Sequence, residues 1–130
     1  MVVNSNGRLG VVASSARYKQ DIKPLGGAAE KLARLRPVTF RYKAEPAATH
    51  YGLIAEEVDR VMPELVVRDG ENRPDSVQYI ELIPLLLQQW KAQRAEIARQ
   101  KAEIAELRQM LATRFAALDG AAGGDRANGR

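Results

Sequence analysis

The chain has 130 residues, of which 45% are apolar and 5% are aromatic. This length is typical of one domain, and the apolar fraction is sufficient for a core, although so few aromatic residues suggest that subunit contacts add to it. The absence of cysteine excludes a disulfide scaffold and any Cys-ligated metal site. The single histidine, His50, cannot supply a multi-histidine cluster, so we expect neither a metal nor a cofactor. We expect His50, beside Tyr51, to be a polar loop residue and not a ligand.

The net charge of +4 is distributed in blocks along the chain. Residues 1–44 hold nine Lys/Arg against two acidic residues, and residues 45–81 hold nine acidic residues against three basic ones. A protein that binds nucleic acid normally gathers its basic residues on one patch. Blocks of opposite sign attract each other, so we expect contacts between them within or between subunits, and no nucleic-acid partner.

No segment has the pattern of a membrane span or a leader peptide. The longest apolar run, Leu85 to Leu87, is far shorter than the roughly 20 residues that a membrane helix needs. Residues 1–6 lack both a charged region and an apolar region of the kind found in signal peptides. We therefore expect a soluble chain without a membrane partner.

The first half of the sequence predicts short strands and short helices. A helix should stop before Arg36, because Arg36 precedes Pro37 and the residue before a proline is disfavoured in the α region. Ile54, Val58 and Val61 repeat at i, i+4 and i+7, which is typical of one helical face. The predicted elements are strands around a turn within 1–13, a helix over 28–35, a strand over 38–42, a helix over 54–62, a strand over 65–67 and an extended segment over 76–79.

The last organised segment has a seven-residue repeat. A straight helix drifts by about 20° per heptad, so a strict period of seven argues against one amphipathic helix folded back on its own domain. When Ile83 is counted as position a of the repeat, the d positions carry leucine, glutamine and arginine, the last of them Arg114. The predicted coiled-coil core is Ile83, Leu86, Trp90, Gln93, Ile97, Gln100, Ile104, Leu107, Leu111 and Leu118.

The flanking charges favour parallel helices. Glu96 and Glu103 occupy g positions, and Lys101 and Arg108 occupy the e positions that follow them. Isoleucine at successive a positions with glutamine at two d positions favours a trimer over a dimer. The fold class is therefore α+β: a small mixed helix and strand domain followed by a long helix in a parallel trimeric coiled coil. Residues 119–130 are rich in Gly and Ala and are predicted to be disordered.

One stretch, Ser14 to Ile22, carries residues suited to chemistry. A serine nucleophile needs a base, and with one isolated histidine a lysine such as Lys19 is the available alternative. A lysine can accept a proton only when it is neutral, which requires burial or neighbouring cations. The alternative is a solvated turn without catalytic function. Arg17 lies between the two residues, and either repels the Lys19 cation or pairs with an acidic residue of the 45–81 block; we favour the ion pair.

Several motifs together resemble the peptidase S74 domain, the intramolecular chaperone of endosialidases and other phage tailspikes and tail fibres. The resemblance covers about Ser14 to Leu118. Ser15 stands where many members have aspartate, and Glu56 where glutamine is frequent. The motifs are Ser14–Ile22, Leu35–Tyr42, Gly52–Val58, Met62–Val66 and Val77–Tyr79, followed by the coiled coil.

The resemblance implies a homotrimeric module that assembles a tail fibre or tailspike and then releases itself by autoproteolysis. Ser14 would be the nucleophile and Lys19 the general base, with the cleaved bond adjacent to Ser14. The parts would be an upstream fibre stub supplied as substrate (1–13), the globular chaperone (14–79), the coiled-coil helix (80–118) and the disordered tail (119–130).

The implied setting is the bacterial host cytoplasm during phage or prophage assembly, with the chaperone absent from the mature virion. Its partners would be two further copies of the chain and the upstream fibre domain of the same chain. Two alternatives stay open: a non-cleaving trimerisation cap, and a basic nucleic-acid module dimerised by a coil. The latter ranks last because its basic residues are not continuous with the coil.

Overall fold

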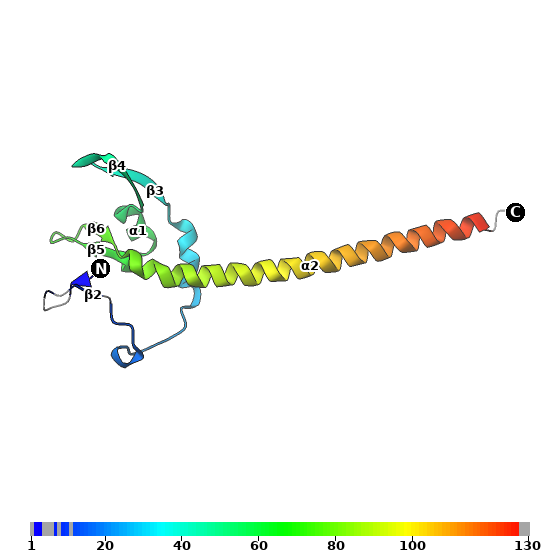
Figure 1. Ribbon diagram of the computed structural model, residues 1–130, viewed down its shortest axis with the longest axis horizontal. Coiled ribbons are helices and arrows are strands. Elements are labelled where there is room, and N and C mark those ends of the chain that lie inside the picture. Colours follow the sequence, from blue (N-terminus) through cyan, green and yellow to red (C-terminus); the bar gives the residue numbers. More distant parts are fainter. Residues whose placement is uncertain (1, 4–6, 8, 11, 128–130) are drawn as a thin grey trace.

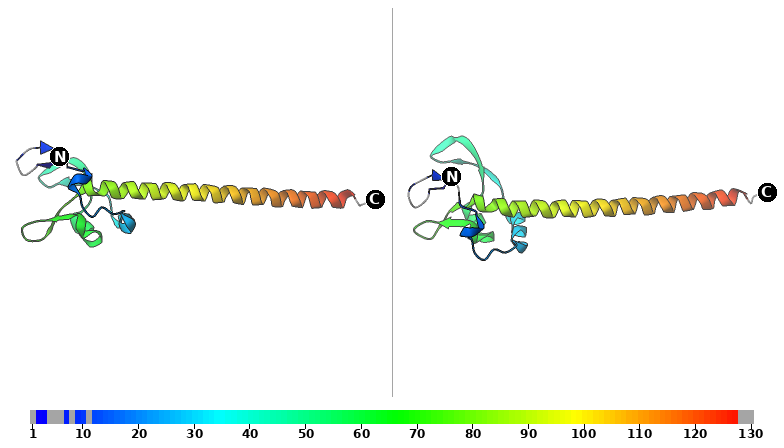
Figure 2. Two further views of the ribbon diagram at one scale, coloured as in Figure 1. Left: turned by 90° about the horizontal axis from the view of Figure 1, so that it is seen from below. Right: turned by 60° about the horizontal axis from the view of Figure 1, so that its bottom comes forward.

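A globular part lies at one end of a single long helix in the computed structural model (Figure 1). The structure describes residues 2–3, 7, 9–10 and 12–127. The long helix, α2, spans Tyr79–Ala127 and has 49 residues, which corresponds to about 70 Å of helix. Two further views show that only the start of α2 lies beside other elements (Figure 2). Strands together with this helix confirm the α+β class.

Among the described residues outside α2, three antiparallel two-stranded sheets and several short helices are formed. The short 3-10 helices are labelled η. In chain order the elements before α2 are β1 (Val2–Val3), β2 (Leu9–Gly10), η1 (Ala16–Tyr18), η2 (Gly26–Arg34), β3 (Val38–Tyr42), β4 (Glu45–Gly52), α1 (Ala55–Val61), η3 (Pro63–Leu65), β5 (Val66–Arg68) and β6 (Pro74–Val77).

The core of the globular part is small. Among the described residues it consists of five buried side chains, which come from η2, α1, the segment around η3 and α2: Ala29, Val58, Met62, Leu65 and Leu85. Val58 is one of the helical-face residues that the sequence pattern predicts. Partly buried leucines and valines surround this cluster, and large apolar side chains elsewhere on the chain are exposed. A core of this size is consistent with the expectation that subunit contacts add to it.

Strand β4 is the main element that the sequence pattern does not predict. Its residues include Pro46 and two alanines, which have low strand propensity, so the segment resembles a loop in sequence. It forms a strand because it pairs with β3, in the register Val38↔Gly52 and Phe40↔His50. His50, which we expected in a polar loop, therefore lies in a strand beside the Phe40 ring, with ring centroids 5.6 Å apart.

The C-terminal end of α2 also differs from expectation. The composition predicts disorder from Asp119, whereas the helix continues to Ala127; the remaining residues, 128–130, lie outside the described part. The physical reason is that alanine has the highest helix propensity, and each glycine reduces helix stability by about 1 kcal/mol without blocking the helical conformation, as proline would. The coiled-coil boundary predicted at residue 80 lies one residue after the observed start of α2.

Two sets of side-chain hydrogen bonds connect the β3–β4 hairpin to the start of α2, and α1 to the segment before β3. The Tyr79 hydroxyl accepts a hydrogen bond from the Leu53 backbone N–H at 2.9 Å and donates one to the Leu53 carbonyl at 3.3 Å. The Arg36 guanidinium donates to both carboxylate oxygens of Glu57, at 2.9 Å and 3.2 Å from Nη2. These contacts join segments that are far apart in sequence. They fix the hairpin against the start of α2, and the segment before β3 against α1.

A third set of hydrogen bonds closes the turn between β5 and β6. The Asp69 carboxylate accepts hydrogen bonds from the backbone N–H groups of Glu71 and Arg73, each at 2.9 Å. The backbone hydrogen bond from Arg73 is the main reason that the pKa of Asp69 lies below its ordinary value. Next to this turn, the Gln78 backbone N–H donates to the Leu65 carbonyl at 2.8 Å and ties the end of β6 to η3 immediately before α2 begins.

The position of the Tyr79 hydroxyl predicts that a side chain at Gly52 would destabilise the fold. A Cβ at this position would lie 2.7 Å from the Tyr79 hydroxyl oxygen and 3.1 Å from Cε1 of Phe40. We expect Gly52→Ala to lower the free energy of unfolding by about 1–3 kcal/mol, the usual cost of overpacking. Chemical denaturation measures this, with Gly70→Ala as the control, because a Cβ at Gly70 meets nothing within 4 Å.

A second variant identifies the contact responsible. Tyr79→Phe removes the hydroxyl oxygen that the new Cβ would meet, so Gly52→Ala should destabilise the Tyr79→Phe variant less than the unmodified protein. An equal loss of stability in both backgrounds would show that the hydroxyl is not the obstacle.

Candidate Ser–Lys site

Ser14 and Lys19 lie side by side in the segment that leads from β2 to η2. The Lys19 ammonium nitrogen, Nζ, donates a hydrogen bond to the Ser14 hydroxyl oxygen, Oγ, at 2.9 Å. The structure thus brings together the two residues that the sequence singles out. Neither side chain belongs to a regular strand or α-helix, and both residues are exposed in the single chain.

A short 3-10 turn produces this approach. Helix η1 spans Ala16–Tyr18, with Ser15 before it in an extended conformation. The Tyr18 backbone N–H donates to the Ser15 carbonyl at 3.0 Å, and the Lys19 N–H donates to the Ala16 carbonyl at 3.1 Å. Ser15 before the turn and Lys19 after it are both extended. The chain folds back at the three residues of tight helix between them, so the long Lys19 side chain reaches Ser14, five positions before it.

Arg17 does not form the ion pair that we favoured. Its guanidinium carbon lies 4.8 Å from the centroid of the Tyr18 ring, a cation–π contact with its own neighbour. The salt bridges found among the described residues do not include Arg17. The alternative considered for this residue, repulsion of the Lys19 cation, stays a prediction.

The hydrogen bond has the geometry that a general base needs. A base must lie within about 2.6–3.2 Å of the atom whose proton it removes. The Nζ–Oγ distance of 2.9 Å meets this condition, with the ammonium as donor in the protonated state. Loss of that proton would leave a nitrogen lone pair directed at the serine hydroxyl, which reverses the direction of the bond and activates the oxygen as a nucleophile.

The predicted coiled-coil residues lie on α2, and most of the apolar ones are exposed in the single chain. Trp90 is 54% exposed, Ile97 51% and Ile104 49%. The ring of Trp90 is covered on one side by the Arg94 guanidinium, 5.0 Å from its centroid. The apolar core positions on this unpartnered face are Ile83, Leu86, Trp90, Ile97, Ile104, Leu107, Leu111 and Leu118.

The charged flanks of α2 are partly paired within the helix. Arg99 forms ion pairs with both Glu96 and Glu103, one of them at 2.9 Å from Nη1 to the Glu103 carboxylate. The hydrogen bond from Arg99 is the main reason that the pKa of Glu96 lies below its ordinary value. Within the described part of the chain, Lys101 and Arg108 take part in no ion pair, so these e-position cations remain available to another helix.

Two further observations concern the described residues only. They contain no group of three or more His, Asp or Glu side chains placed to hold a metal ion. None of their helices combines the length and the apolar character required to cross a membrane.

Residues 14–67 match the model of the peptidase S74 family, the chaperone of endosialidase. The match begins at Ser14 and confirms the resemblance found in the sequence motifs up to Val67. It supports a chaperone role for the chain and an association with an upstream fibre or endosialidase domain, and the family name suggests a self-cleaving peptidase. No curated protein sequence matches the chain significantly.

The motifs after Ser14–Ile22 have structural roles in this molecule. Arg36 and Glu57 belong to two different motifs and form an ion pair with each other. Gly52 begins one motif and makes room for Tyr79, which ends another. The sequence motifs include these residues, but the spacing of the motifs does not show which residues contact each other. Only the first motif contributes the Ser14–Lys19 pair.

Proposed function

We propose that the chain is an intramolecular chaperone that trimerises, assists assembly of an upstream fibre or spike, and then cuts itself off next to Ser14. The observation that carries the proposal is the 2.9 Å hydrogen bond between Lys19 Nζ and Ser14 Oγ, in a segment that begins the family match. Ser14 acts as the nucleophile and Lys19 as the general base, then as the general acid.

The proposed chemistry is a single-turnover acyl transfer. Ser14 Oγ attacks the carbonyl carbon of the Ala13–Ser14 peptide bond while its proton moves to neutral Lys19. The peptide nitrogen of Ser14 then leaves with the proton that Lys19 returns, and Ala13 is held as an ester on Oγ. Water hydrolyses the ester, which gives an Ala13 carboxylate, a Ser14 amino group and a regenerated hydroxyl.

Ring size favours the bond before Ser14 over the bond after it. Attack on the Ala13 carbonyl passes through a five-membered ring, whereas attack on the carbonyl of Ser14 itself would need a strained four-membered ring. No substrate pocket is required, because the nucleophile is covalently attached beside its target and proximity replaces binding.

The exposed apolar face of α2 supports assembly. Helices in proteins derive most of their stability from packing of an apolar face, and this face has no partner within the described part of the chain. A parallel three-stranded coiled coil would cover it, with Glu96 and Glu103 of one helix facing Lys101 and Arg108 of the next. The ion pairs with Arg99 would then be shared with, or exchanged for, contacts between helices.

The same proposal covers the setting of the protein. The upstream partner is a fibre or tailspike domain of the same chain, for which residues 1–13 are the last segment. Assembly takes place in the bacterial host cytoplasm during phage or prophage development. After cleavage the trimeric chaperone leaves, and the mature virion does not contain it.

Mass spectrometry of the purified protein tests cleavage directly. We expect the intact mass to be replaced over time by a product that begins at Ser14 and a peptide that ends at Ala13. A trimer that keeps its full mass indefinitely would identify the chain as a non-cleaving trimerisation cap.

The pH dependence of cleavage tests the role of a titrating base. The rate should rise with pH by roughly tenfold per unit and then level off, because only a neutral amine accepts the serine proton. The measurement is the rate of product formation by mass spectrometry, with circular dichroism as a check that the fold is unchanged. A rate independent of pH from mildly acidic to alkaline conditions would indicate strain-driven cleavage without a titrating base.

A further inference from the structure

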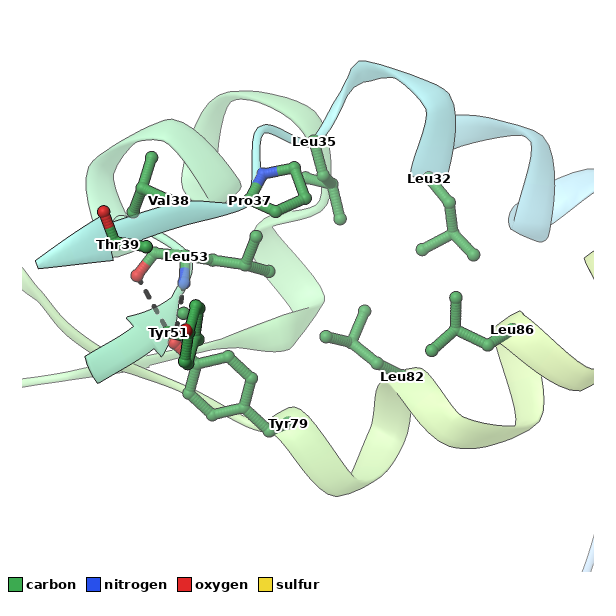
Figure 3. A pocket seen from close by; sticks show the side chains of 11 residues that line it. Leu32, Leu35, Pro37, Val38, Thr39, Tyr51, Leu53, Tyr79, Leu82 and Leu86 are labelled. Carbon is green, nitrogen blue, oxygen red and sulfur yellow. Dashed lines mark hydrogen bonds between the residues drawn. The ribbon is translucent and has the colours of Figure 1, made fainter. Parts of the chain in front are cut away.

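An open apolar pocket lies between the start of α2, the helix η2 and the β3–β4 hairpin. Its volume is about 520 Å³. Leu82 and Leu86 of α2 point across it toward Leu32 of η2, and Tyr79 lies at its other end (Figure 3). The lining is almost entirely apolar, and Leu86 at its edge is 57% exposed. Such a surface is unfavourable in water unless something covers it.

The heptad register places this pocket at the edge of the coiled-coil face. Counting from Ile83 as position a, Tyr79 and Leu86 occupy d positions and Leu82 occupies a g position. Tyr79 and Leu82 also contact the domain itself, through the Leu53 hydrogen bonds and through packing against the core. Two further positions face the domain: Leu85, at c, is buried in the core, and Gln88, at f, donates to the Gly26 carbonyl at 2.6 Å. The pocket therefore opens on the g and d side of the helix, where a parallel coiled coil places a neighbour.

The residues at e positions change character along α2. Farther along they are basic, namely Arg94, Lys101 and Arg108, and are suited to ion pairs with acidic g positions. At the start of the helix they are apolar, Ile80 at 55% and Leu87 at 57% exposed. In a parallel coil a g residue meets the e residue five positions later on the next chain. The register that pairs Glu96 with Lys101 therefore also pairs Leu82 with Leu87.

We infer that the pocket is a docking site for a second copy of this chain, whose Leu87 side chain enters it beside Leu82. This inference rests on the proposed coiled-coil assembly and extends it from the helices to the globular parts. Charge complementarity farther along α2 sets the register, and the apolar e and g residues at its start deliver Leu87 to the pocket. Each globular part thus holds the helix of its neighbour as well as its own.

Disulfide trapping tests the inference on a clean background, because the chain contains no cysteine. The test variant carries Leu32→Cys with Leu87→Cys, and mild oxidation should shift it from the monomer to the covalent trimer on a non-reducing gel. A second variant, Leu82→Cys with Leu87→Cys, reports the register of the helices alone. The matched control, Leu32→Cys with Gln88→Cys, uses the adjacent residue, which faces its own domain, and should stay at monomer mass.

The outcomes separate the docking site from the assembly. Covalent trimers from the 82/87 pair without any from the 32/87 pair would leave the proposed trimer standing and overturn docking in the pocket. Covalent dimers from both pairs would support docking of a second copy but overturn the three-stranded arrangement. Sedimentation of the unmodified protein as a monomer would overturn both the inference and the proposed assembly.

Discussion

Ser14→Ala is expected to abolish self-cleavage while leaving the helix content and the sedimentation behaviour unchanged. Removal of a serine nucleophile lowers the rate of a serine peptidase on the order of 10⁶-fold, so no product should accumulate. The side chain is exposed and its one hydrogen bond among the described residues is to Lys19, so little packing is lost. Intact mass over time, circular dichroism and sedimentation velocity measure the three properties.

Lys19→Arg should give the same loss of cleavage for a different reason. Arginine retains the positive charge and can still donate to Ser14 Oγ, but its guanidinium stays protonated and cannot accept the serine proton. Lys23→Arg is the matched control, since it makes the same change at another exposed lysine of the same segment and should cleave normally. Normal cleavage by the Lys19→Arg variant would exclude Lys19 as the base.

The strands and helices that could be predicted from the sequence are those with a clear local pattern. Strand β3 spans the predicted residues 38–42, and α1 lies within the helix predicted over 54–62. Strand β4 could not be predicted in this way, because its formation depends on pairing with β3 and not on the propensity of its own residues. The same reason explains why the expectation of a loop at His50 is wrong.

The candidate site could be predicted only in part. Resemblance of Ser14–Ile22 to a family motif singles out Ser14 and Lys19, whereas a serine and a lysine five residues apart carry little information by themselves. Their contact depends on the 3-10 turn at Ala16–Tyr18, which no pattern in its own residues predicts. Contacts such as that between Tyr79 and Leu53 depend on tertiary packing and could not be inferred from spacing.

In a single chain, both the coiled-coil core of α2 and the candidate base are exposed to solvent. The core positions are about half exposed, for example Ile97 and Ile104, and Lys19 is exposed as well. A chaperone that released itself before its trimer formed would leave the fibre chains out of register. Burial of the Ser14–Lys19 pair against a neighbouring subunit would link the two events, because removing an ammonium from water favours its neutral form.

Charging the coiled-coil core should therefore stop both assembly and cleavage. The double variant Ile97→Lys with Ile104→Lys would place six like charges on the axis of a trimer. Each unpaired buried charge costs several kcal/mol, so the chains should separate. We expect this variant to sediment as a monomer and to keep residues 1–13 attached, although Ser14 and Lys19 are untouched.

The control variant carries the same charges on the outside of the coil. Ala98→Lys with Ala105→Lys adds two lysines per chain one residue after each isoleucine, at b positions that face solvent, so it should remain trimeric and cleave. Loss of cleavage in the Ile97/Ile104 variant but not in this control would connect scission to the coiled coil and not to the added charge. A monomeric variant that cleaves at the normal rate would show that one chain contains the complete site, and that trimer formation does not control scission.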